Sequence, residues 1–205
     1  MSKLDSMNTL LVDELRDLYD AEQQLTRALP KMAKAATTPE LREAFEEHLQ
    51  ITEQHISRLE ESLQALESDA RGKKCKGMQG LIEEGQDHVE AEGDEDVIDA
   101  ALIGAAQKVE HYEISAYGTA REHATCLGHT EIADLLQQTL DEERETDRKL
   151  SALAEDLVNR QAVGGSMEDD AELDDEEDEE SIEELAKPAP KGAKPKGTTR
   201  GRSRS

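Results

Sequence analysis

Carboxylates and imidazoles occur at positions where the core of a helical protein would lie. Glu22, His48, His55, Glu113 and Glu143 each fall in register with Leu, Ile, Val or Ala rather than with charged residues. A buried carboxylate is costly unless it is paired or holds a metal ion. Several that converge in one bundle core indicate a metal site built from side chains on facing helices.

Four long segments carry these residues, and each has the three- and four-residue apolar spacing of an amphipathic helix. We expect helices over residues 5–36, 38–70, 96–125 and 130–159. Thr38 and Pro39 are start signals for the second helix, and Gly128 is a stop signal for the third. Pro30 is expected to kink the first helix or end its regular part, because proline cannot donate the backbone hydrogen bond.

The segment between the second and third helices, residues 71–95, is too long for a simple turn between antiparallel neighbours. It contains a short helical pattern over residues 78–92 and could travel the length of a bundle. A four-helix bundle with one long crossover is the ferritin-like topology. We therefore predict an all-α, ferritin-like four-helix bundle over residues 1–163, with a short extra helix in the crossover.

The composition changes after Gly164 and Gly165. Residues 168–184 contain no Lys or Arg, whereas residues 187–205 contain seven Lys or Arg and no acid. Neither block carries enough apolar surface to fold, so residues 164–205 are predicted to be a disordered, acidic-then-basic tail. The basic block could contact nucleic acid through phosphates; we favour a solvated tail that associates with itself.

The overall composition excludes several classes of function. A net charge of −25 repels nucleic acid and anionic membranes from most of the surface, and 2% aromatic residues provide no stacking platform for single strands. No apolar run approaches membrane-spanning length, the N-terminus becomes charged too soon for a signal peptide, and Cys75 and Cys126 have no pairing motif. We expect a cytoplasmic protein without membrane association.

Ferritin-like di-metal proteins take a Glu from each of two helices and Glu-x-x-His from each of the other two. Alignment of the apolar stripes places His55 opposite Thr146 and Thr52 opposite Glu143. The second helix therefore reads Thr-x-x-His and the fourth reads Glu-x-x-Thr. Each half keeps one of the two ligand types, so the spacing survives but the full motif does not.

Further carboxylates and a further imidazole are available on the same faces. Glu110 lies one turn before Glu113, and His48 is a further ligand or a partner of one. The candidate metal ligands are Glu22, His48, His55, Glu110, Glu113 and Glu143, with Glu142 and Asp147 as weaker candidates. These ligand types suit iron, manganese or zinc. Tyr19 and Tyr112 are expected near the centre, where we favour core packing with a polar tip.

The chain resembles the YciE/YciF-type bacterial stress proteins, a ferritin-like family, over about residues 8–160. The matching stretches are DLYDAEQQLTRAL at 17–29, His48-Leu49 together with Thr52, GLIEE at 80–84, AALI at 100–103 and AQKVEHYEI at 106–114, the last being the most specific. The resemblance implies a compact bundle with a short helix in the crossover, homodimers, and a di-metal centre related to that of rubrerythrin-like proteins.

Carried over by position, the ligands implied by the resemblance are Glu22, Glu110, Glu113 and Glu143. The second helix departs from the family pattern, since His55 stands where Gln is frequent and Ile51 where Glu is common.

We expect a ferritin-like di-metal carboxylate protein with a role in stress response that oxidises Fe²⁺ or consumes peroxide. Iron is the expected metal, with manganese or zinc as alternatives, and the reactant is a small-molecule oxidant. No catalytic residue is assigned. The alternative is a metal-free helical-bundle interaction protein whose inward polar groups hydrogen-bond with one another, with the basic tail contacting nucleic acid.

Overall fold

The computed structural model describes residues 5–70 and 72–155, and this part of the chain contains helices and no strand. The helices are α1 (Met7–Ala35), α2 (Pro39–Ala65), α3 (Lys76–Val89), α4 (Glu95–Leu127) and α5 (Thr130–Leu153). The all-α prediction is confirmed. The predicted tail, residues 164–205, lies outside the described residues, as does the predicted end of the last helix.

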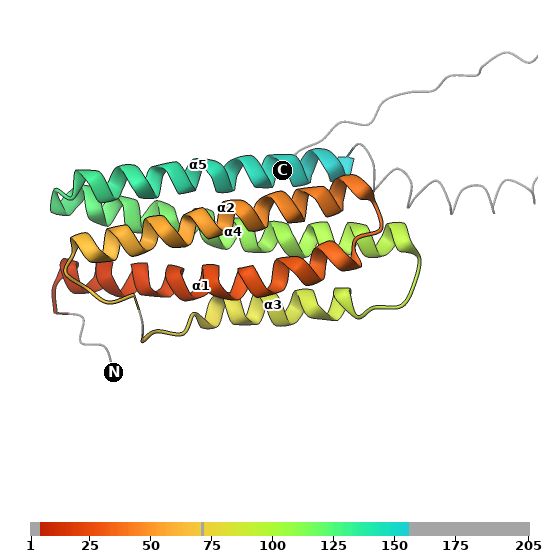
Figure 1. Ribbon diagram of the computed structural model, residues 1–205, viewed down its shortest axis with the longest axis horizontal. Coiled ribbons are helices and arrows are strands. Elements are labelled where there is room, and N and C mark those ends of the chain that lie inside the picture. Colours follow the sequence, from red (N-terminus) through yellow and green to blue (C-terminus); the bar gives the residue numbers. More distant parts are fainter. Residues whose placement is uncertain (1–4, 71, 156–205) are drawn as a thin grey trace, which may run out of the picture. The chain divides into compact units, whose positions relative to one another are not determined.

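Four of the helices form a bundle, which Figure 1 shows from the side. α1 packs against α2 and α4, and α5 packs against the same two helices. Short connections join α1 to α2 and α4 to α5. The connection from α2 to α4 instead runs along the bundle and carries α3, which packs on α1 and α4. This is the predicted topology, with one long crossover and the extra helix within it.

The first helix ends close to the predicted residue 36, whereas the second ends earlier than predicted. α1 continues through Pro30 to Ala35, so of the two effects expected of Pro30, a kink or an end to the regular helix, the end does not occur. Pro30 is exposed, and the carbonyl group that loses its N–H partner can therefore bind water. α2 ends at Ala65 because Glu67 adopts a left-handed φ of 50° and Ser68 N–H bonds back to the carbonyl of Leu63 at 2.9 Å.

The turn between α1 and α2 is fixed by a carboxylate from α4. Asp99 is fully buried and accepts hydrogen bonds from Thr37 N at 2.9 Å, Thr37 Oγ1 at 2.9 Å and Thr38 N at 2.7 Å. Thr38 is the N-cap residue, as predicted, but its own side chain makes no capping bond. Asp99 therefore ties one end of the α1–α2 pair to α4.

α3 begins where Cys75 packs beneath Tyr112 of α4. The thiol of Cys75 lies 2.9 Å from Tyr112 Oη, which donates to Asp17 of α1 at 3.0 Å. Gly77 allows this approach, since a Cβ atom there would lie 2.7 Å from the Tyr112 ring. Burial raises the pKa of Cys75, which favours a structural thiol over a reactive one.

Two apolar clusters fill the bundle, and every bundle helix passes from one to the other. The first includes Leu25, Leu29, Leu41, Phe45, Leu102 and Leu150, and the second includes Leu11, Leu15, Leu59, Leu63, Tyr117 and Leu136. Between these stretches, each helix buries polar side chains: Glu22, His48, Thr52, His55, Glu110, Glu113, Thr139 and Glu143. We call these eight residues the polar layer. Within the described ranges, no helix is long and apolar enough to cross a membrane.

Candidate metal centre

All six predicted ligands lie in the polar layer. Their relative exposures are at most 3%, and four of them are fully buried. α1 supplies Glu22, α2 supplies His48 and His55, α4 supplies Glu110 and Glu113, and α5 supplies Glu143. Each side chain points inward because it continues the three- and four-residue spacing of its helix's apolar stripe.

The six residues form two groups that share one carboxylate. The first contains His48, Glu110, Glu113 and Glu143, and the second contains Glu22, His55 and Glu143. Within each group, one nitrogen or oxygen atom per residue lies within 4.8 Å of those of the others. Glu143 therefore stands where a carboxylate bridging two ions would be needed.

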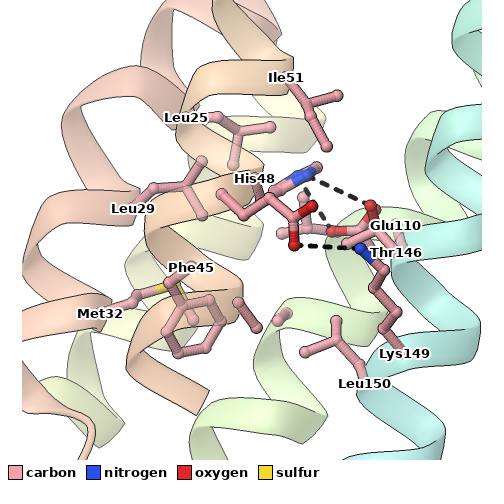
Figure 2. A pocket seen from close by; sticks show the side chains of 14 residues that line it. Leu25, Leu29, Met32, Phe45, His48, Ile51, Glu110, Thr146, Lys149 and Leu150 are labelled. Carbon is pink, nitrogen blue, oxygen red and sulfur yellow. Dashed lines mark hydrogen bonds and ion pairs between the residues drawn. The ribbon is translucent and has the colours of Figure 1, made fainter. Parts of the chain in front are cut away.

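His48 lies between its neighbours on α4 and α5. Its Nε2 is 3.3 Å from Glu110 Oε1, and its Nδ1 is 3.4 Å from Thr146 Oγ1. Figure 2 shows these contacts at the polar end of a pocket that is otherwise lined mainly by apolar side chains, including Leu25, Leu29, Phe45 and Leu150.

His55 is enclosed by carboxylates on both sides of its ring. Its Nδ1 lies 3.1 Å from Glu143 Oε1 and 3.3 Å from Glu22 Oε1. Its Nε2 lies 2.9 Å from Glu142 Oε2. Glu22 also accepts a hydrogen bond from the buried hydroxyl of Tyr117, whose ring packs edge-on against His55 with the ring centroids 6.2 Å apart.

Burial perturbs the ionisation of the layer. Burial raises the pKa values of Glu22, Glu110 and Glu113, and neighbouring carboxylates raise those of Glu110 and Glu113 further. Burial alone would raise the pKa of Glu143, but contact with His55 lowers it. Burial alone would lower the pKa of His55, but Glu143 and Glu22 raise it to about 10. Without another cation, the protonated His55 is the positive charge that these carboxylates share.

The layer has more buried polar atoms than its side chains can satisfy. Among the described residues, nine atoms of the layer make no hydrogen bond: Glu22 Oε2, His48 Nε2, Thr52 Oγ1, His55 Nδ1, Glu110 Oε2, and both carboxylate oxygens of Glu113 and Glu143. Three of them, His48 Nε2, His55 Nδ1 and Glu143 Oε1, lie in the ion-pair contacts described above. Buried polar groups are normally hydrogen-bonded. A cluster of unpaired oxygen and imidazole nitrogen atoms is the donor set that iron, manganese or zinc takes, so these residues fit a metal centre.

The alignment of α2 with α5 that the sequence suggested is wrong. The long crossover makes α2 and α5 antiparallel, so His48 faces Thr146, while Arg58, one helical turn beyond His55, donates to Thr139 at 3.1 Å. His55 therefore faces Glu143 rather than Thr146.

The antiparallel pairing shows which residues replace the ligands that the two incomplete Glu-x-x-His motifs lack. Thr52 stands at the Glu position of the α2 motif, and Thr146 stands at the His position of the α5 motif. His48 fills the place beside Thr146 from the facing helix, and Glu110 adds a carboxylate from α4. The layer thus holds four Glu and two His, the same set as the complete di-metal motif.

Other residues considered from the sequence lie away from the layer. Tyr19 bonds to Glu60 and Tyr112 bonds to Asp17, whereas Tyr117, which was not singled out, contacts Glu22. Its position four residues after Glu113 is the signal that could have identified it, since such positions share a helix face.

The two weaker ligand candidates on α5 also lie outside the layer. Asp147 accepts from Gln107 at 3.2 Å. Glu142 pairs with Arg58 at the edge of the bundle and contacts the outer nitrogen of His55.

Comparisons with known proteins agree with this fold. Residues 6–163 match the family model described as a domain of unknown function, DUF892. The chain is 45% identical to the protein YciF of Escherichia coli K12 over 161 residues, which cover 78% of this chain and 96% of YciF. The crystal structure of YciF, described as an E. coli stress protein, superimposes with a TM-score of 0.74 over 76% of this chain and 99% of that one.

A second solved structure is similar. It is YcfI from Rhodopseudomonas palustris, for which a structural role has been suggested; it is 40% identical, with a TM-score of 0.71 over 73% of this chain and 95% of that one.

Proposed function

Because this chain belongs to the DUF892 family, in which YciF is a close relative, we propose that it is a di-metal carboxylate protein with a role in stress response. One ion is held by Glu22, His55 and Glu143, and the other by His48, Glu110, Glu113 and Glu143. Iron is the metal we propose, with manganese or zinc as alternatives. Bound iron would supply the one-electron redox chemistry that carboxylates and imidazoles lack.

The observation that carries this proposal is the set of nine unpaired atoms in the polar layer. A metal-free interaction protein, the alternative, requires inward polar groups that satisfy one another. The structural role suggested for YcfI favours that alternative. Buried groups without a hydrogen bond cost about 1–3 kcal/mol each, however, and Glu113 lacks one at both of its oxygens. Such a cost is readily explained where the groups bind an ion.

The shared position of Glu143 gives a specific test. Metal content is measured for the full chain, purified natively and then loaded aerobically with Fe²⁺, and for the variants Glu143→Ala and Glu113→Ala. We expect about two ions in the parent protein. Glu143→Ala removes a ligand of both groups and should lose both ions, whereas Glu113→Ala should keep the ion at Glu22 and His55. Normal metal content in Glu143→Ala would contradict the proposal.

The pocket beside His48 supports a small uncharged oxidant as the reactant. Its volume is about 30 Å³, and its walls come from all four bundle helices. The pocket is lined mainly by apolar side chains, and its polar end is formed by His48, Glu110 and Thr146. At its outer edge, Lys149 donates to Glu47 at 3.0 Å. A space of this size and polarity suits dioxygen or undissociated peroxide better than an anion.

Filling the pocket tests the oxidant route separately from metal binding. Ala44 lines the pocket and is half-buried, so Ala44→Leu should keep the metal content but slow aerobic Fe²⁺ oxidation severalfold. Ala116→Leu is the matched control because Ala116 lines a different pocket, on the α1–α4 side. Equal oxidation rates for the Ala44 variant and the parent protein would show that the oxidant arrives elsewhere.

A further inference from the structure

Glu142 and Glu143 are consecutive on α5 and hold His55 from opposite sides. Consecutive helical residues point about 100° apart, so Glu143 enters the polar layer while Glu142 stays at the edge with its side chain 30% exposed. Glu142 Oε2 lies 2.9 Å from His55 Nε2, and Glu143 Oε1 lies 3.1 Å from His55 Nδ1. The imidazole is therefore fixed at both nitrogens by one short segment of α5.

Arg58 holds Glu142 in place through both carboxylate oxygens. Its Nη2 donates to Oε1 at 2.9 Å and its Nη1 donates to Oε2 at 2.5 Å. A guanidinium has only N–H donors, so both oxygens of Glu142 act as acceptors. Arg58 Nη1 also donates to Thr139 Oγ1 at 3.1 Å, which ties this pair to the buried face of α5.

The hydrogen bond to Glu142 determines which nitrogen of His55 carries the proton on the outer side of the ring. Glu142 can only accept, so Nε2 of His55 must be the donor. The nitrogen that faces the centre is Nδ1, which lies 3.1 Å from Glu143 Oε1 and 3.3 Å from Glu22 Oε1. A histidine that donates one N–H to a carboxylate and offers its other nitrogen to an ion is a general arrangement in metal sites.

We propose that Glu142, held by Arg58, is a positioning residue that orients His55 so that Nδ1 binds the ion of the Glu22–His55–Glu143 group. This inference rests on the proposed di-metal function. Glu142 itself would not touch the ion, and its side chain bonds to His55, Arg58 and Gln138 rather than to the ligands of the other group. Removal of the Glu142 carboxylate should therefore weaken the binding of one ion and leave the binding of the other unchanged.

The test is a Co²⁺ titration of the full-length, chelator-treated protein, followed by calorimetry and by visible absorption. We expect the parent protein to bind two Co²⁺ ions per chain. Glu142→Ala should bind one ion about 10–100-fold more weakly and change the absorption of that ion, while the other keeps its affinity. Glu142→Gln keeps an oxygen that accepts from His55 and should recover most of the affinity.

Glu145→Gln is the matched control, since Glu145 is on the same helix and pairs with Arg148 at an exposed position. It should leave both ions unchanged. The melting temperature of each metal-free variant is compared with that of the parent protein, so that a loss of His55 positioning can be distinguished from a loss of folding.

The outcomes distinguish the two proposals. If the Glu142→Ala protein binds two Co²⁺ ions with the affinities of the parent protein, the positioning role is overturned and the di-metal function still stands. Equal losses of both ions, or an equal loss in Glu142→Gln and Glu142→Ala, would also overturn it. A parent protein that binds no Co²⁺ would overturn the di-metal function itself.

Discussion

Glu113 is the residue whose presence is hardest to explain by stability alone. It is fully buried, and neither of its oxygens has a hydrogen-bond partner. Burial and the charges of Glu22 and Glu143 raise its pKa, so it is a poor anion unless a cation is near. Glu113 is thus costly in the folded protein, and the proposed role as a metal ligand accounts for that cost.

Replacing Glu113 with Leu should make the metal-free protein more stable. A side chain of similar volume without polar atoms removes the unsatisfied oxygens, which cost about 1–3 kcal/mol each when they are buried without a hydrogen bond. We expect a gain of about 1–2 kcal/mol in the free energy of unfolding, measured by urea denaturation with chelator present, together with loss of metal.

The control for this change is Glu145→Leu at an exposed site of α5, which should alter the free energy of unfolding by less than about 0.5 kcal/mol. A metal-free Glu113→Leu protein that unfolds more easily than the parent would show that Glu113 stabilises the bundle by itself.

The packing of the helices depends on hydrogen bonds between residues that are far apart in the sequence, and those of Asp99 are the clearest case. Its three hydrogen bonds hold the α1–α2 turn against α4. Asp99→Ala removes all three and leaves buried donors unpaired, so we expect it to lower the free energy of unfolding by about 2–3 kcal/mol. Asp99→Asn keeps one acceptor oxygen and should cost about half as much.

The stabilisation from Asp99 should depend on pH in one direction. Burial alone would raise the pKa of Asp99, but the hydrogen bonds from Thr38 and Thr37 lower it below the ordinary value of 3.8. The folded state therefore favours the charged form, and the stabilisation is present above pH 3.8 and is lost as the pH falls through the lower, folded-state value. The stability gap between the parent and Asp99→Asn, measured by urea denaturation, should be constant near neutral pH and shrink in acid. A gap that widens in acid would contradict this assignment.

Apolar spacing was sufficient to predict the helices and the inward direction of the six ligands. Glu22, His48, His55, Glu110, Glu113 and Glu143 are all buried, because a residue that continues an apolar stripe has no other direction in which to point. Spacing within one helix carries no information about the direction of its neighbour. The predicted long crossover, however, already makes the second and fourth bundle helices antiparallel, so the pairing of His48 with Thr146 follows from the predicted topology rather than from the spacing.

Contacts across helices were also missed for the same reason. Arg58 has the pattern of a surface residue and Glu142 was predicted only as a weaker ligand candidate; the antiparallel packing of α2 on α5 brings them together beside His55. Asp99 likewise gave no signal as a cap, because the residues that it caps lie about 60 positions earlier.

At the scale of the whole molecule, the bundle concentrates buried charge in one layer between two apolar clusters. The clusters supply the stability that lets the layer carry unpaired groups. The net charge of −25 attracts cations to the surface of the chain, which favours metal uptake. Homodimer formation and contact of the tail with nucleic acid stay predictions from the sequence; light scattering and salt-dependent DNA binding of the full chain measure them.

The central claim is that the polar layer holds two metal ions, and elemental analysis of the natively purified full-length protein tests it most directly. The protein should be produced with iron and manganese available and measured before any chelator is added. We expect about two ions per chain, with iron predominant. No metal in the purified protein, and none after aerobic loading with Fe²⁺, would contradict the di-metal assignment and favour a metal-free interaction protein.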